Sequence, residues 1–193
     1  MSRIISGQFK GHGLVLPKVK STRPTSERFK ESLFSVLLAR LPEAVFLDAF
    51  AGSGQIGLEA LSRGAAKAFF VEPKQQARVA LQRNIKALGL DETRAQLMPM
   101  TLERAIKSFR GTDQRFDLIY LDPPWKWDKP FRHLGNALGK GELLKPDTIV
   151  VTESEASKET PFDEIAVAIG FDPIFDREYG SARLKIYARR DAL

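Results

Sequence analysis

Phe46-Leu-Asp-Ala-Phe-Ala-Gly-Ser-Gly-Gln-Ile-Gly-Leu-Glu-Ala-Leu61 is the part of the sequence that decides the fold. Its apolar start predicts a short strand, and the apolar positions Ile56, Leu58 and Leu61 predict a helix after the loop. The glycines between and within them, Gly52, Gly54 and Gly57, permit a tight turn and a close approach of the backbone to a ligand. A strand, a glycine-rich loop and a helix in this order place backbone N–H groups beside a nucleotide-like molecule.

Repeated strand–helix units follow that loop. The predicted strands are 45–48, 68–72, 95–98, 116–121 and 148–153, and the predicted helices are 55–63, 74–88, 101–109 and 130–139. The strands 116–121 and 148–153 are apolar almost throughout, which indicates burial on both faces of a parallel sheet. Near the end, residues 170–175 and 182–188 flank Tyr179-Gly-Ser181 and predict an antiparallel hairpin at the sheet edge. We therefore expect an α/β fold with helices on both faces of a mostly parallel sheet.

The excess positive charge lies at the amino terminus. Residues 1–30 hold seven Lys or Arg against one Glu, which accounts for the whole formal net charge of +6. Such a segment suits a polyanion such as nucleic acid, and a solubilising tail is the alternative that charge alone leaves open. Short apolar pieces alternate with glycine over 3–19 and predict a small β-hairpin. We expect a basic arm over 1–22 and one α/β domain over 23–193.

A first helix is predicted after Thr22-Arg-Pro-Thr25, where Thr25 or Ser26 can cap its amino end. Helical spacing assigns Phe29, Leu33, Val36 and Leu37 to its apolar face and Arg28, Lys30 and Glu31 to its polar face. We expect the first face to pack on the core and the second to face solvent.

The composition excludes several kinds of site. The chain has no cysteine, so disulfides and thiolate metal sites are ruled out, and its two histidines do not suit a multi-histidine metal site. No apolar run approaches the length of a membrane span, and the first residues lack the apolar core of a signal peptide. We therefore expect no metal, no membrane partner and a cytoplasmic location.

Two acidic residues extend the prediction for the glycine loop. Asp48 stands near the end of the strand before it, and Glu72 ends the next strand, 24 residues later. A carboxylate at the second position can accept hydrogen bonds from both hydroxyls of a ribose. The alternative is that both residues only cap helix amino ends, where negative charge is favourable.

A second motif, Asp122-Pro-Pro-Trp125, follows the strand 116–121. Two consecutive prolines prevent a helix and fix an extended loop at the carboxyl edge of the sheet, beside the glycine loop. Asp122 and the carbonyl of Pro123 then form two acceptors that fit an exocyclic –NH₂ group. Accepting both protons favours a pyramidal nitrogen that can attack an electrophilic methyl group, and Trp125 offers a face for stacking a base. The alternative is a rigid proline turn with a buried tryptophan.

These motifs resemble those of class I S-adenosylmethionine-dependent methyltransferases that methylate amines, and in particular the bacterial 16S ribosomal RNA guanine-N2 methyltransferase (RsmD) family. The segments that carry the resemblance are Arg3-Ile-Ile-Ser-Gly-Gln-Phe-Lys-Gly11, Arg23-Pro-Thr-Ser-Glu-Arg-Phe-Lys-Glu-Ser-Leu-Phe34, Asp48-Ala-Phe-Ala-Gly-Ser-Gly54, Gly57-Leu-Glu-Ala-Leu-Ser-Arg-Gly64, Asp122-Pro-Pro-Trp125 and Tyr179-Gly180. The arm and the segment from Gly57 to Gly64 are the most specific. The resemblance implies a Rossmann-like class I fold with a mostly parallel seven-stranded sheet.

The resemblance also implies a reaction. A methyl group would pass from S-adenosylmethionine, leaving S-adenosylhomocysteine, to N2 of one guanine in 16S rRNA of an assembling or assembled small subunit, with no oligomer required. The cofactor-binding residues that it implies are Arg23, Thr25, Asp48, Ala51, Gly52, Ser53, Gly54, Glu72, Met100 and Thr101. The catalytic residues would be Asp122, Pro123, Pro124 and Trp125, and the RNA-binding residues Arg3, Lys10, Lys18, Lys20 and Arg28. Leu97-Met-Pro-Met-Thr101 departs from the family, because many relatives place an acidic or amide residue there against the adenine.

Two other functions stay open from the sequence. The same chemistry could act on DNA adenine or on a protein amide, although no separate target-recognition domain is evident and Asp122 replaces the Asn expected for an amide. An RNA-binding assembly factor that holds the cofactor without turnover is the third reading, and the intact Asp122-Pro-Pro-Trp125 argues against it.

Overall fold

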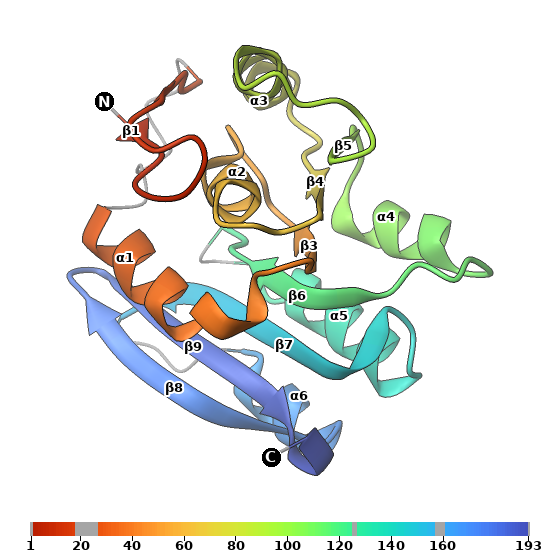
Figure 1. Cartoon of the computed structure of the whole chain (residues 1–193). Helices are drawn as coiled ribbons and strands as arrows, with labels where there is room; N and C mark the ends of the chain where they lie inside the picture. Colours follow the sequence, from red (N-terminus) through yellow and green to blue (C-terminus); the bar gives the residue numbers. More distant parts are fainter. Residues whose placement is uncertain (1, 18–26, 125–126, 157–160, 193) are drawn as a thin grey trace. The chain divides into compact units, whose positions relative to one another are not determined.

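The computed structural model describes residues 2–17, 27–124, 127–156 and 161–192 (Figure 1). The chain divides into two compact units, Met1–Thr101 and Leu102–Leu193. The predicted boundary between the arm and the α/β domain, and the predicted helix cap at Thr25 or Ser26, lie outside the described residues.

The first unit contains a parallel sheet of three strands in the order β5-β4-β3. These strands are β3 (Val45–Asp48), β4 (Lys67–Val71) and β5 (Ala95–Met98), and Leu47 lies opposite Phe69 in the register. Helix α2 (Gln55–Ser62) contacts β3 and β4, and α3 (Gln75–Ala87) contacts β5. Side chains on both faces of β3 and β4 are buried.

The amino-terminal arm is packed against α2. Strands β1 (Ser2–Arg3) and β2 (Gly13–Leu14) form the predicted antiparallel pair. The backbone N–H of Gln8 donates to the carbonyl oxygen of Ser62 at 2.7 Å, and the hydroxyl of Ser62 donates to the carbonyl of Ser6 at 2.6 Å. Gly7 has a φ of +83°, and a Cβ there would lie 1.8 Å from the Ser62 oxygen, so only glycine fits this contact.

A buried acid of α2, Glu59, anchors the arm through hydrogen bonds to its backbone. The carboxylate of Glu59 accepts the backbone N–H groups of Ile5 at 2.9 Å and Ser6 at 3.0 Å, and it also accepts Arg63 Nε at 2.9 Å. Lys30 Nζ lies 3.6 Å from the same carboxylate, and both side chains are fully buried. The segment from Gly57 to Gly64, which carries much of the family resemblance, therefore includes the anchor of the arm.

Two expectations for the first helix, α1 (Glu27–Val36), were wrong. Lys30 belongs to the buried side and not to the polar face, because its ammonium donates to the Arg3 carbonyl at 2.5 Å and faces Glu59. Val36 is 36% exposed, whereas Phe29 and Leu33 are buried as predicted. Burial lowers the pKa of Lys30. A short 3-10 turn, η1 (Leu38–Arg40), follows the helix.

The second unit contains four strands in the order β6-β7-β9-β8. Strands β6 (Phe116–Leu121) and β7 (Leu144–Glu155) are parallel, and β8 (Phe171–Tyr179) and β9 (Ala182–Arg189) form the predicted antiparallel hairpin. The helical elements are α4 (Leu102–Phe109), α5 (Lys129–Gly139), α6 (Asp163–Ala168) and the final turn η2 (Arg190–Ala192). Helix α6 was not predicted. No helix among the described residues is long and apolar enough to cross a membrane.

Candidate functional site

The glycine loop of the first unit is held open by its backbone conformation. Gly52 and Gly54 have φ values of +54° and +83°, in the left-handed region that favours glycine. A Cβ added at Gly52 would meet no atom within 4 Å, whereas one at Gly54 would press on the side chain of Leu81 at 2.4 Å. The backbone at Gly52 is therefore accessible to a ligand, and Gly54 is required by packing where α2 begins.

Asp48 ends β3 and lies under this loop. Its side chain is 1% exposed, and Oδ2 accepts the backbone N–H of Gly57 at 3.0 Å. The pKa of Asp48 is raised to about 7, chiefly by burial and to a smaller extent by the nearby charge of Glu72, while hydrogen bonds from Gly57 and Phe50 act in the opposite direction. A buried carboxyl with a strongly raised pKa beside an open loop is typical of a functional site.

Glu72 follows β4 and ties the loop to the neighbouring strand. Its Oε2 accepts the backbone N–H of Gly52 at 3.0 Å, and its Oε1 accepts that of Lys74 at 2.7 Å. Burial also raises the pKa of Glu72. Because each carboxylate oxygen has a second lone pair, these hydrogen bonds leave acceptor capacity for ribose hydroxyls. The assignment of Glu72 to a ribose stays a prediction.

The other cofactor residues predicted in the first unit belong to the loop itself or follow the strand β5. The N–H of Ala51 donates to the carbonyl of Val71 at 3.1 Å, which joins the loop to the end of β4. Met100 and Thr101 follow the carboxyl end of β5, and the N–H of Glu72 donates to Met98 there at 3.1 Å. The structure thus brings the predicted residues Asp48, Ala51–Gly54, Glu72, Met100 and Thr101 to the carboxyl ends of three adjacent strands.

Asn84 is a residue of this loop region that the sequence analysis missed. Its amide nitrogen donates to the carbonyl of Ser53 at 2.9 Å and to that of Val15 at 3.0 Å, and its oxygen accepts the N–H of Val15 at 2.8 Å. Asn84 is 1% exposed on the buried face of α3. The available signal was its spacing, since it occupies an apolar helical stripe with Ala80 and Leu81.

The predicted acceptor motif lies in the second unit, at the carboxyl end of β6. Leu121 ends the strand and is fully buried, Asp122 is half-buried, Pro123 is buried and Pro124 is exposed. The carbonyl of Pro124 accepts the N–H of Trp127 at 2.8 Å. Helix α5 begins two residues later, at Lys129.

Several predicted site residues lie outside the described residues: Lys18, Lys20, Arg23, Thr25 and Trp125. Of the other predicted RNA-binding residues, Arg3, Lys10 and Arg28 are exposed. Arg3 forms an ion pair with Glu27 at 3.0 Å. The described residues contain no group of three or more His, Cys, Asp or Glu that could hold a metal ion.

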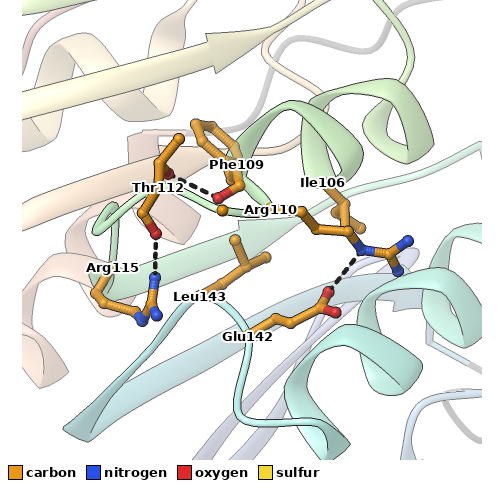
Figure 2. A pocket seen from close by; sticks show the side chains of 8 residues that line it. Ile106, Phe109, Arg110, Thr112, Arg115, Glu142 and Leu143 are labelled. Carbon is orange, nitrogen blue, oxygen red and sulfur yellow. Dashed lines mark hydrogen bonds and ion pairs between the residues drawn. The ribbon is translucent and has the colours of Figure 1, made fainter.

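A separate pocket of about 190 Å³ lies at the amino end of β6 (Figure 2). Six residues of β6, at roughly 3.3 Å each, span about 20 Å between this end and Asp122. Two arginines line the pocket, but Arg110 Nε lies 3.1 Å from Glu142 and Arg115 donates to the Thr112 carbonyl at 3.0 Å (Figure 2). The pocket is therefore distinct from the predicted site, and each of these arginines already has an acceptor.

Similarity to other proteins covers nearly the whole chain. Residues 2–188 match the model of the family described as Conserved hypothetical protein 95. YlbH of Bacillus subtilis (strain 168) is 34% identical over 190 residues, which cover 97% of this chain and 99% of YlbH. The protein of Haemophilus influenzae named Ribosomal RNA small subunit methyltransferase D is 32% identical over 156 residues, which cover 81% of this chain and 80% of the relative.

Solved structures confirm the Rossmann-like class I methyltransferase fold. The structure of yhhF from Escherichia coli has a TM-score of 0.79 and 26% identity, and the match covers 97% of both chains. SMU.776, which was solved as a complex with SAH, has a TM-score of 0.67 and 15% identity over 82% of this chain and 49% of that one, which shows the fold alone. The family match and the sequence relatives together show that the chain belongs to the RsmD family, described as Conserved hypothetical protein 95.

Proposed function

We propose that this protein transfers a methyl group from S-adenosylmethionine to the exocyclic N2 amine of a guanine in 16S rRNA. The observation that carries the proposal is the pair of buried carboxylates, Asp48 and Glu72, around a glycine loop that is open at Gly52. Membership of a family that includes proteins named as small-subunit rRNA methyltransferases supports the substrate class.

The glycine loop and its carboxylates suit the donor. S-adenosylmethionine supplies an electrophilic methyl group on a sulfonium centre. Asp48 carries negative charge when ionised and would face the cationic methionine part, while the open backbone at Gly52 admits the ligand. Glu72 has acceptor capacity for the ribose, and Met100 and Thr101 would border the adenine. Arg23 and Thr25 are proposed to complete this site from the segment that follows the arm.

The residues at the end of β6 suit the acceptor. A nucleobase amine is a poor nucleophile because its lone pair is delocalised into the ring. The Asp122 carboxylate and the Pro123 carbonyl would accept its two N–H protons and favour a pyramidal nitrogen. When N2 forms its bond to the methyl group, the carbon–sulfur bond breaks and one N2 proton leaves to water. Pro124 keeps the turn extended, and Trp125 would stack on the guanine.

The basic arm supplies the phosphate contacts. Arg3, Lys10 and Arg28 are exposed, and Lys18 and Lys20 add charge to the same part of the sequence. Contacts of this kind position an RNA without reading its sequence. The arm is anchored through Glu59 and Ser62 of α2, so phosphates bound by Arg3 or Lys10 would be held at a fixed place on the first unit. The RNA would be presented by an assembling or assembled small subunit.

Methyl transfer with labelled S-adenosylmethionine tests the proposal. The protein is incubated with naked 16S rRNA, with small-subunit particles from cells that lack it, and with duplex DNA. Label is expected in rRNA, and Asp122→Ala is expected to abolish transfer while cofactor affinity stays near normal. The matched control is Asp117→Ala, a half-buried acid on β6, the strand that Asp122 follows.

Each alternative gives a different result in that assay. Label found only in DNA, or only in protein, would replace the rRNA substrate. Calorimetry that shows cofactor and RNA binding without any label transfer would support a non-catalytic assembly factor. Loss of cofactor binding in Asp122→Ala would contradict the role given to Asp122.

A further inference from the structure

Trp127 has a large aromatic side chain that is exposed to solvent. It is 57% exposed, and among the aromatic side chains that the structure describes it alone is exposed, the others being buried or half-buried. Covering an exposed indole with a flat partner removes its apolar surface from water, which lowers the free energy. The side chain is therefore placed to bind something outside the chain.

The backbone of Trp127 has a contact with the proposed acceptor motif. Its N–H donates to the carbonyl of Pro124 at 2.8 Å, and Pro124 belongs to that motif. The backbone carbonyl of the following residue, Asp128, accepts the N–H of Phe131 at 3.1 Å at the start of α5. Phe131 is buried, with its ring centroid 6.3 Å from that of Phe162. The indole thus lies directly before the first turn of α5 in the second unit.

The charges beside Trp127 favour a polyanion. Lys129 and Arg132 are exposed at the start of α5, and the exposed Asp128 is the one acid among residues 127–132. The first turn of α5 contains no acidic residue, and the amino end of a helix carries partial positive charge. An aromatic face with neighbouring cations is the combination that single-stranded nucleic acids bind, by stacking a base and pairing a phosphate.

We propose that Trp127 stacks on an unpaired base of the RNA next to the target nucleotide. This inference rests on the proposed function, because it takes the RNA substrate from it. A base in a duplex hides its faces from an indole, so the base is expected to lie in a loop or a strand opened at the target. An apolar groove of another protein, or of a second copy of this chain, is the competing partner, and the charges argue against it.

Fluorescence tests the contact directly. The chain has two tryptophans, so Trp125→Phe leaves Trp127 as the only indole and keeps an aromatic ring at position 125. Adding a short single-stranded 16S rRNA fragment, without cofactor, is expected to quench the indole and protect it from acrylamide. RNA binding seen by anisotropy of a labelled fragment, with an unchanged indole signal, would overturn the inference. Protection that appears with protein concentration alone would overturn it in favour of self-association.

Turnover gives the second test. Trp127→Ala is expected to lower kcat/KM for rRNA by about 30-fold, the middle of the range for loss of one stacked base. Trp127→Phe should keep most of the activity, and cofactor affinity should not change in either variant. Val167→Ala is the control, since Val167 is 56% exposed in α6 of the same unit. Trp127→Ala with the activity of this control would refute the role. If the unmodified protein transfers no methyl group to rRNA, the proposed function fails, and the fluorescence titration still decides on Trp127.

Discussion

The raised pKa of Asp48 predicts that cofactor affinity depends on pH with a definite sign. Asp48 is 1% exposed, and its pKa is raised to about 7, so the carboxyl is mostly protonated below that pH in the free protein. A cationic ligand favours the ionised carboxylate and lowers this pKa. The proton must therefore leave when the ligand binds, and the affinity for S-adenosylmethionine should rise as the pH rises toward and through 7.

The size of the effect follows from the pKa difference. If the bound ligand lowers the pKa of Asp48 by about two units, the affinity rises about 20-fold between pH 5.5 and pH 7.5. An α-amino group has an ordinary pKa of about 7.7–8.0, so the charge of the ligand changes little below pH 7. S-adenosylhomocysteine lacks the sulfonium charge, and its affinity should depend less steeply on pH.

Calorimetry at pH 5.5, 6.5 and 7.5 measures the dissociation constant at each pH. Repeating the titration in two buffers of different ionisation enthalpy counts the protons released, and close to one proton is expected near pH 6. Asp48→Asn should bind more weakly with a nearly flat pH dependence. Asp113→Asn, at an exposed acid of the second unit, is the matched control and should keep the full slope. Proton uptake on binding, or an unchanged slope in Asp48→Asn, would refute this reasoning.

Three substitutions test the packing around the site. Gly57→Ala should lower the free energy of unfolding by about 2–3 kcal/mol, because its Cβ would lie 2.3 Å from the Phe70 ring; an unchanged denaturation midpoint would contradict this. Glu59→Gln leaves the buried Lys30 without its counter-charge and should lower the free energy of unfolding, measured in urea, by about 3 kcal/mol. Glu103→Gln, in an exposed ion pair, is the control and should lower it by less than about 0.5 kcal/mol. Equal effects of the two substitutions would contradict the role of Glu59 as a buried anchor. Asn84→Asp sets carboxylate oxygens against two backbone carbonyls and should lower both stability, by about 1–3 kcal/mol, and cofactor affinity; unchanged affinity by calorimetry would separate this residue from the loop.

Much of the fold could be predicted because local and tertiary signals agree. The strands at 45–48, 95–98 and 116–121 were predicted with the bounds that the structure shows, since each is a short apolar run between helical patterns. The assignment of Lys30 to a polar face failed because its partner, Glu59, lies 29 positions away along the chain. Helical spacing cannot reveal such a pairing. Helix α6 is six residues long and gives too few repeats of a helical pattern.

Some residues of the candidate site could be predicted from the sequence, and others could not. Asp48, Gly52 and Glu72 could be named because the turn between parallel strands and helices has a limited set of sequences. The contacts of Asn84 could not be derived, because they depend on where the arm docks on α3. The contacts of Glu59 could not be predicted either, because the segment from Gly57 to Gly64 was identified only by its resemblance to the family.

The most direct test of the central claim is the mass of the modified nucleotide. Mass spectrometry of 16S rRNA fragments from cells with and without this protein should show one guanine that carries a methyl group only when the protein is present. Digestion to nucleosides should identify the product as N2-methylguanosine, and restoring the protein with Asp122→Ala should not restore it. An identical set of methylated guanosines in both rRNAs, or a missing methyl group on another nucleobase, would contradict the account.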